Sequence, residues 1–293
     1  MAEELRLNTA QRMIRTVENA AVTLAAGQMI CMTGGHGWFY GLEADGPDAV
    51  RRAARVQIKA RSDWVKFMAS GGFAEAGEQP GAVQLDLVEL TAGVQEARKV
   101  GLPTAAHAHG AEAIKNVLRA GIDSVEHASF PDDEAIELML KTGAFIVPTF
   151  TVYYKMKELG PSQGLDPYLI DLVNRSWERK LERFAVMWKA GVPVAAGSDN
   201  GSPLAPHGDI VTELQLLVQA GLTPYDALAA ATVNAARLLR LDAEIDTVEP
   251  GKRADLVILG ADPLQDVQAA RRVHSVMKDG RLYSPAASAH PQR

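Results

Sequence analysis

The feature that most constrains the fold is an alternation of short apolar stretches with segments of helical periodicity along most of the 293 residues. Four of the apolar stretches carry a side chain that can ionise at or near their carboxyl end, namely 63–72, 104–110, 122–128 and 192–200. Strand–helix alternation is typical of a parallel sheet with helices packed on it. We predict that the sheet is wound into a TIM-like barrel. Because the catalytic groups of such barrels lie at the carboxyl ends of the strands, the four side chains are expected to converge.

One stretch shows the arrangement most clearly, since it ends in His107 and His109 followed by a glycine. Residues two apart on a strand point to the same face, so these two histidines are predicted to lie together. His127 and Asp199 lie at the ends of later strands. Imidazole nitrogen and carboxylate oxygen are ligands suited to zinc. The pattern therefore predicts a metal site built from several strands.

Lys66 is unusual because it lies among apolar residues, and burying an unpaired ammonium is costly. One interpretation places it on the outer face of the strand, with its charged end reaching water. The other is that CO2 carbamylates it, which removes the positive charge and makes a carboxylate able to bridge two metals. A catalytic metal acidifies its bound water and polarises a carbonyl. Asp199 would then bind metal and hold or receive the proton of that water.

Two further residues are candidates for contact with substrate. His36 lies in a Gly-rich loop after the apolar stretch 28–32, and the loop lacks the Gly-Lys-Ser/Thr ending of a phosphate-binding loop. Tyr153 follows the strand expected at 144–150. The alternatives are an ordinary loop histidine and a tyrosine that packs amphipathically.

Composition and charge narrow the class of protein. With 47% hydrophobic and 23% charged residues, the chain is expected to be globular. A net charge of −6 without a basic stripe argues against a nucleic-acid partner. The single Cys31 excludes an intrachain disulfide and fits a reducing compartment. Neither a signal peptide nor an apolar run of about 20 residues is recognisable, so we expect a cytoplasmic protein that does not enter a membrane.

The remaining pattern predicts the order of elements. Helices are expected at 14–24, 48–60, 85–100, 111–120, 131–142, 168–190, 209–220 and 223–239. Short strands at 254–259, 273–277 and 281–283 are expected to form an appendage, the last two as a hairpin through Asp279 and Gly280. The expected division is a barrel domain at 1–245, a small β-sandwich remnant at 246–285 and a disordered tail at 286–293.

Taken together, these motifs resemble the metal-dependent amidohydrolase superfamily, in the branch with prolidase-like, imidazolonepropionase-like and ochratoxin-hydrolysing members. The most specific parts are Met-Thr-Gly-Gly-His-Gly at 32–37, Val-Lys-Phe-Met-Ala-Ser-Gly-Gly at 65–72, Ala-His-Ala-His-Gly at 106–110, Val-Glu-His at 125–127, Gly-Ser-Asp at 197–199 and Pro-Gly-Lys-Arg-Ala-Asp-Leu at 250–256.

The resemblance implies roles for the residues that match the family pattern. Lys66 matches the carboxylated lysine that bridges two metals, and His107 and His127 match the ligands of one metal. Asp199 matches the catalytic aspartate at the second metal, while His109 and His36 match positions that face substrate. A small amide or dipeptide-like substrate and one or two divalent metals, with zinc expected, are implied too.

The chain departs from the family pattern at its beginning. It has no first strand with the family's metal-binding His-x-His motif, and the second strand is also missing. About six of eight barrel strands are expected, ending near Thr33, Ala69, His109, Ala128, Phe150 and Asp199. Two open sheet edges would result, and a homo-oligomer is one way to cover them.

Three functions follow from these observations. The first is hydrolysis of an amide or dipeptide-like C–N bond by metal-activated water. The second is a catalytically impaired amidohydrolase, or a binding protein, without a complete binuclear site. The third is a metal-free barrel of the aldolase kind with a Schiff base on Lys66. Metal content separates the first two, and borohydride trapping on Lys66 tests the third.

Overall fold

The computed structural model describes residues 24–201 and 204–283. Its centre is a parallel sheet of six strands in the order β2-β1-β3-β4-β5-β6. The strands are β1 (Ile30–Cys31), β2 (Leu42–Glu43), β3 (Val65–Met68), β4 (Thr104–Gly110), β5 (Ser124–Phe130) and β6 (Phe145–Val147). The helix expected at 14–24 and the tail at 286–293 fall almost wholly outside the described residues.

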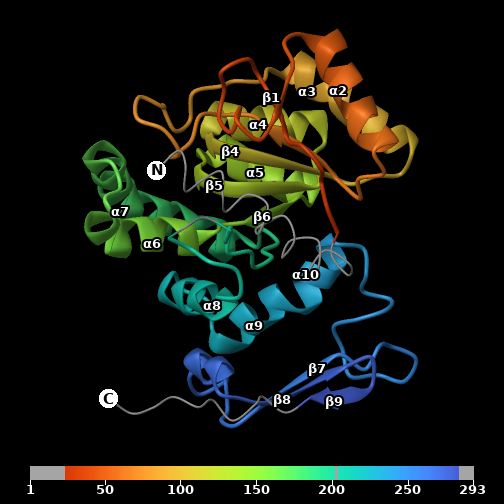
Figure 1. Ribbon diagram of the computed structural model, residues 1–293, viewed down its shortest axis with the longest axis vertical. Coiled ribbons are helices and arrows are strands. Elements are labelled where there is room, and N and C mark those ends of the chain that lie inside the picture. The colour runs from red at the N-terminus through yellow and green to blue at the C-terminus, as the bar shows by residue number, and fades with distance from the viewer. Residues whose placement is uncertain (1–23, 202–203, 284–293) are drawn as a thin grey trace.

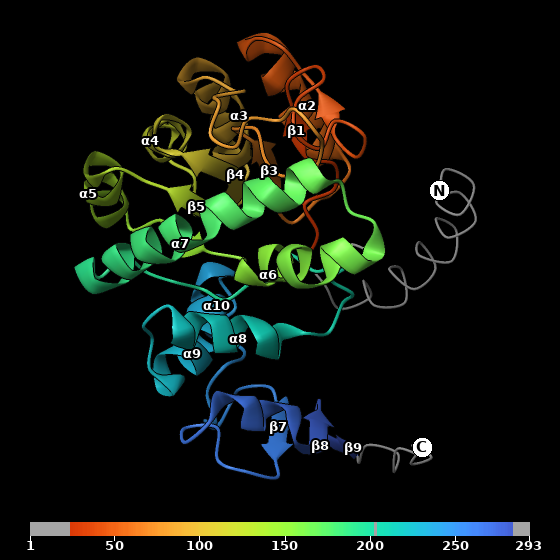
Figure 2. The ribbon, with the colours of Figure 1, turned by 90° about the vertical axis from the view of Figure 1, so that its left-hand side faces the viewer.

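Helices cover the sheet in the arrangement expected for an α/β fold (Figures 1 and 2). An arc on the outside of the sheet is formed by α2 (Pro47–Lys59), α3 (Leu87–Lys99), α4 (Ala111–Ala120) and α5 (Asp133–Thr142). Across from it lie α6 (Phe150–Leu159), the 3-10 turn η1 (Gly160–Gln163) and the long α7 (Pro167–Ala190). Below them follow α8 (Ile210–Gln219), α9 (Pro224–Ala231) and α10 (Val233–Leu238).

One face of the sheet packs against the outer helices, and the other face carries the side chains of the candidate site. Phe67, Ala106 and Val125 are buried on the side of the outer helices. Phe67 lies so close to Gly93 of α3 that a Cβ at Gly93 would be 2.5 Å from the Phe67 ring. Side chains alternate along a strand, so Lys66 and His107 point to the opposite face, where the candidate site lies.

Helix ends follow the sequence signals. Asp86 and Glu89 form a capping box at the start of α3, and Thr223 and Asp226 form another at the start of α9, with Pro224 at the first helical position. Such caps satisfy backbone N–H groups that have no partner within the helix. Helices α4, α5 and α7 end at Gly121, Gly143 and Gly191, each left-handed, a conformation that glycine adopts without strain.

Four expectations about elements are corrected. The short strand β2 lies where only a loop was expected, and α6 begins at Phe150, where the sequence suggested a strand end followed by an irregular excursion. The strand expected at 192–199 is reduced to a single parallel bridge between Val194 and Ile146 of β6. The helix expected at 223–239 is divided at Thr232, whose backbone leaves the helical region.

Within the described residues the parallel sheet does not close into a barrel. Its edges are β2 and β6, and the segment around Val194 extends the β6 edge by the one bridge. The expected fold class, an incomplete α/β barrel with a C-terminal β appendage, is therefore confirmed. The appendage is one antiparallel sheet of β7 (Leu256–Leu259), β8 (Val273–Lys278) and β9 (Arg281–Tyr283), next to the 3-10 turn η2 (Val267–Arg271). The expected hairpin joins β8 to β9.

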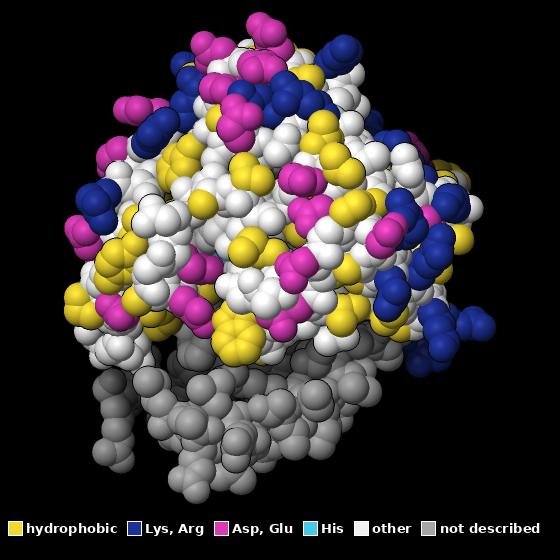
Figure 3. Space-filling model, turned by 90° about the horizontal axis from the view of Figure 1, so that it is seen from above, with side chains coloured by type: hydrophobic (Ala, Val, Ile, Leu, Met, Phe, Trp, Pro, Cys, Tyr) yellow, Lys and Arg dark blue, Asp and Glu magenta, His cyan; other side chains and the backbone are white. Residues whose placement is uncertain are grey.

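Figure 3 shows charged side chains of both signs on one face of the molecule. Acidic and basic side chains lie among apolar ones on this face, and several basic side chains gather along its right-hand edge. In the part of the chain that the structure describes, no helix has both the length and the apolar character needed to cross a bilayer.

Candidate metal centre

Three buried histidines form the centre of the candidate site. His107 and His109 come from β4 and His127 from β5, and each offers a ring nitrogen that lies within 4.8 Å of the other two. The ring centroids are 4.6 Å apart for His107 and His109, 4.6 Å for His107 and His127, and 4.7 Å for His109 and His127. The predicted pairing of His107 with His109 on one face is therefore confirmed.

A β-bulge turns His127 toward the other two histidines. Ala108 of β4 pairs with His127, but Gly110 pairs with Phe130, so β5 carries an extra residue there. In a regular strand, His127 would point to the same side as Ala108, into the packed core. Instead His127 and Ala128 have φ of 71° and 40°. This left-handed backbone is costly for residues with a Cβ, and bulges of this kind re-aim side chains.

Hydrogen bonds fix which nitrogens of the histidine rings remain available. The Nε2 of His107 is 3.3 Å from the carbonyl oxygen of Gly71, which can only accept, so Nδ1 keeps its lone pair. The Thr149 hydroxyl donates to the Pro148 carbonyl oxygen. Its oxygen, 2.6 Å from Nδ1 of His127, therefore accepts from that nitrogen and leaves Nε2 free. His109 Nδ1 contacts the Ser129 hydroxyl at 2.7 Å.

Burial keeps the histidines neutral. It is the largest cause that lowers the pKa of His107, His109 and His127 well below the usual value of 6.5. Positive charge nearby, including that of Lys180 beside His109 and His127, lowers these pKa values further. Neutral imidazole is the form that binds a metal. The cluster is therefore in the protonation state that a divalent cation requires.

Lys66 and Asp199 lie near the cluster: the positive charge of Lys66 lowers the pKa of His107 and His127 and also acts on Asp199. The ammonium of Lys66 forms an ion pair with Glu126 of β5, and Ser124 donates to the other oxygen of that carboxylate at 2.6 Å. This pair accounts for a lysine among apolar residues, since a paired charge can be buried. Neither Lys66 interpretation anticipated it.

Asp199 has a left-handed backbone, with φ of 51°. Loss of water around its carboxylate raises its pKa, which the positive charges of Lys66 and Lys180 partly counteract. The carboxylate therefore lies within the electrostatic reach of the site, although it is not among the groups that approach each other within 4.8 Å.

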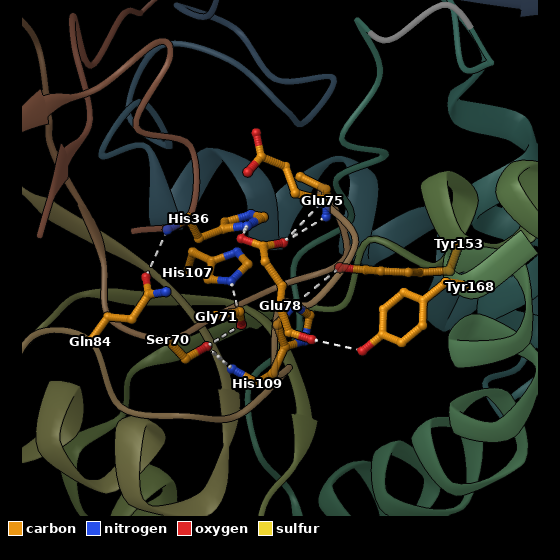
Figure 4. A network of polar contacts seen from close by, with 11 residues as sticks. His36, Ser70, Gly71, Glu75, Glu78, Gln84, His107, His109, Tyr153 and Tyr168 are labelled. Atoms are coloured by element: carbon orange, nitrogen blue, oxygen red, sulfur yellow. Dashed lines mark hydrogen bonds and ion pairs between the residues drawn. The ribbon is translucent and has the colours of Figure 1, made fainter. Parts of the chain in front are cut away.

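The loop between β3 and α3 carries Glu78, which contacts His36 (Figure 4). The His36 ring stacks on His107 with centroids 4.2 Å apart, and its Nδ1 is 2.8 Å from Glu78. Burial opposes ionisation of Glu78, but hydrogen bonds from His36 and from two backbone amides outweigh it and lower the pKa. Tyr168 of α7 donates to the carbonyl of Glu78 at 3.3 Å.

Tyr153 reaches the histidines from α6. Its hydroxyl is 3.1 Å from Nδ1 of His127 and 3.4 Å from Nε2 of His109. Four of the residues singled out from the sequence, His36, His107, His109 and Tyr153, are seen together in Figure 4. The other three are Lys66, His127 and Asp199: the Tyr153 hydroxyl contacts His127, and the charge of Lys66 acts on His107, His127 and Asp199.

Four residues of this region received no role from the sequence: Glu78, Glu126, Lys180 and Glu213, of which Glu126 lies in the Val-Glu-His motif at 125–127. Two of them had a signal. Lys180 lies on the helical stripe of buried residues that includes Trp177 and Phe184, and Glu213 precedes Leu216 and Leu217 at helical spacing. A charge on an apolar stripe marks a buried polar contact or a functional group. We see no comparable signal for Glu78, which lies in a loop.

The fold and the site define an α/β protein with an incomplete barrel and a histidine cluster at the carboxyl rim of its sheet. The model of the Amidohydrolase family matches residues 3–283, and the chain belongs to this family. The resemblance seen in the sequence motifs is thereby confirmed.

Two proteins of known structure are similar to this chain. Ochratoxinase of Aspergillus niger is 34% identical over 252 residues, covering 82% of this chain and 50% of that protein. Its crystal structure superposes with a TM-score of 0.79 at 29% identity, covering 92% of this chain and 69% of that one. The structure of a Xaa-Pro dipeptidase with methionine bound in its active site gives a TM-score of 0.82 at 29% identity, covering 94% and 72% of the two chains. The chain thus spans about half the length of the curated ochratoxinase.

Proposed function

We propose that this protein is a zinc-dependent hydrolase that cleaves the C–N bond of a small amide or dipeptide-like substrate. The observation that carries the proposal is the cluster of three buried, neutral histidines whose nitrogens approach within 4.8 Å at the carboxyl rim. Its family and its relatives, an ochratoxinase and a Xaa-Pro dipeptidase among them, support the reaction class.

The residues present fit a divalent metal. Nδ1 of His107 and Nε2 of His127 keep lone pairs, because the other nitrogen of each ring meets an acceptor. Such partners orient a histidine as a ligand. We propose that His107, His127, Asp199 and a carbamylated Lys66 hold one or two zinc ions. When bound, zinc would lower the pKa of a water molecule and polarise the scissile carbonyl.

The chain's own residues would supply proton transfer and orientation. Asp199, whose pKa is raised, is suited to take a proton from the attacking water and pass it to the leaving nitrogen. We assign contact with substrate to His36, His109 and Tyr153, because His109 belongs to the cluster and the other two contact it. Burial of the cluster excludes bulk water and strengthens these electrostatic interactions.

The ion pair between Lys66 and Glu126 favours a second candidate function. Carbamylation requires Lys66 to lose its proton, and the resulting negative group would repel Glu126, so Glu126 would have to turn away. If the ion pair persists, the rim would bind an amide ligand without turning it over. The borohydride-trapped Schiff base, the third hypothesis, requires a free amine, and this ion pair also opposes it.

Metal analysis and hydrolysis measured together test the proposal. We expect protein purified without added metal to contain close to stoichiometric zinc, and to hydrolyse Met-Pro or hippuryl-L-phenylalanine. EDTA should abolish turnover and added zinc should restore it. His107→Ala should lose both zinc and activity, whereas His274→Ala, which changes an exposed histidine of β8, should lose neither. Zinc-free wild-type protein with an unmodified Lys66 and no turnover would support the second candidate instead.

A further inference from the structure

Lys180 is a buried charge that the proposed mechanism leaves without a role. It lies on the inner stripe of α7, its residue is 4% exposed, and its Nζ has no hydrogen-bond partner among the described residues. An unpaired buried ammonium is strongly disfavoured, because burial removes the water that would solvate its charge. A position of this kind needs a compensating contact.

The compensating contact is the face of Tyr153. The Nζ of Lys180 lies 3.7 Å from the centroid of the Tyr153 ring and 5.3 Å from that of Phe150. A cation over an aromatic face is attracted by the electron density of the ring, and the attraction grows when both groups are removed from water. Burial lowers the pKa of Lys180, and the negative charges of Glu213 and Asp199 oppose that shift.

Glu213 fixes the start of α6, the helix that carries Tyr153. It lies on α8, is 0% exposed, and accepts hydrogen bonds from the amides of Phe150 and Thr151 at 2.9 and 2.7 Å and from the Thr151 hydroxyl at 2.7 Å. These amides belong to the first turn of α6. Thr149, the residue before α6, has φ of 51° and donates its hydroxyl to the Pro148 carbonyl rather than to the helix amides. Glu213 therefore takes the place of the helix cap.

Glu213 and Lys180 constrain Tyr153 at two different points. Glu213 fixes the backbone of α6 one turn before Tyr153, and Lys180 packs on its ring. Phe73 contacts the ring edge with centroids 5.0 Å apart. These contacts hold the Tyr153 hydroxyl 3.1 Å from Nδ1 of His127 and 3.4 Å from Nε2 of His109.

We propose that Lys180 and Glu213 are positioning residues that hold the Tyr153 hydroxyl at the histidine cluster, where it donates a hydrogen bond to the substrate oxygen that gains negative charge. Preorganised donors of this kind are a major source of rate enhancement. The inference rests on the proposed hydrolase function for its chemistry, but the arrangement of the three side chains does not.

A spectroscopic experiment separates the arrangement from the activity. The metal-free protein is labelled with tyrosine carrying carbon-13 at Cζ, and the Tyr153→Phe variant assigns one of the six tyrosine signals. We expect Lys180→Met to shift and broaden the Tyr153 signal alone, and Lys180→Arg to leave it close to its original position. Lys189→Met, an exposed lysine on the same helix, should change nothing. Glu213→Gln should broaden the Tyr153 signal without moving the others.

The kinetic arm uses hippuryl-L-phenylalanine with the zinc-loaded protein. Tyr153→Phe should lower kcat about 100-fold, the scale of one lost transition-state donor, and Lys180→Met about tenfold with little change in KM, which is the signature of an interaction made in the transition state. Lys180→Arg should recover most of the loss. An unchanged Tyr153 signal in Lys180→Met and Glu213→Gln would overturn the proposal. A wild-type chain that hydrolyses nothing but shows the expected signals would refute the proposed function and leave the positioning arrangement standing.

Discussion

The buried histidine cluster makes the stability of the metal-free protein depend on pH in a way that can be calculated. In the folded chain the pKa values of His107, His109 and His127 lie well below 6.5, mainly because of burial. In the unfolded chain each returns to about 6.5. The unfolded chain therefore binds protons that the folded chain does not. The stability contribution is complete above pH 6.5 and is lost as the pH falls below that value.

The size of the loss follows from proton linkage. Lowering the pH from about 7 to about 5.5 favours the unfolded state by about 1.2 kcal/mol for each histidine that stays neutral when folded. Three such histidines give about 4 kcal/mol, which is a large part of the stability of an ordinary domain. Removing one of them from the titration should reduce the loss by about a third.

The assay is urea unfolding in EDTA at the two pH values, comparing wild type with His127→Gln and His274→Gln. Carboxylates that titrate in the same range are common to all three proteins, so the difference isolates the histidine. We expect the pH-dependent loss to be about 1.2 kcal/mol smaller in His127→Gln and unchanged in His274→Gln, because His274 is exposed on β8. Equal pH dependence in wild type and His127→Gln would show that His127 is protonated in the folded chain, and the reasoning would be refuted.

Three further substitutions test the packing that supports the site, each by the free energy of unfolding in urea. Phe67→Ala removes a fully buried ring and should cost about 3–5 kcal/mol; a cost below about 1 kcal/mol would mean that β3 does not pack on α3. Gly93→Val places a Cβ 2.5 Å from the Phe67 ring and should destabilise by at least about 1–3 kcal/mol, whereas a neutral result would contradict that close approach. Thr223→Ala removes the capping box of α9 and should cost about 1 kcal/mol, with Thr247→Ala, which lies outside any helix, as its matched control.

Local sequence signals predicted much of the fold because local physics decides those features. The pair His107 and His109 follows from strand alternation, and the start of α9 follows from Thr223, Pro224 and Asp226. The glycines that end α4 and α5 are likewise readable, because they adopt the left-handed backbone. Each of these features depends on residues within a few positions of one another.

Features that depend on distant partners were not predictable in the same way. The start of α6 at Phe150 is held by Glu213, which lies 63 residues away, and no pattern near Phe150 announces it. The bulge that turns His127 arises from the register between β4 and β5. Lys66 illustrates the same limit, because its partner Glu126 lies two strands away in the sheet and becomes visible only once the strands are aligned.

The central claim is that donors from neighbouring strands meet at one rim and hold a metal. The most direct measurement is an anomalous difference map, recorded on both sides of the zinc absorption edge, from crystals of protein purified without added metal. We expect a zinc peak bonded to His107 and His127, with density for a carbamate on Lys66. A map without a peak at these histidines, with Lys66 still paired to Glu126, would contradict the claim.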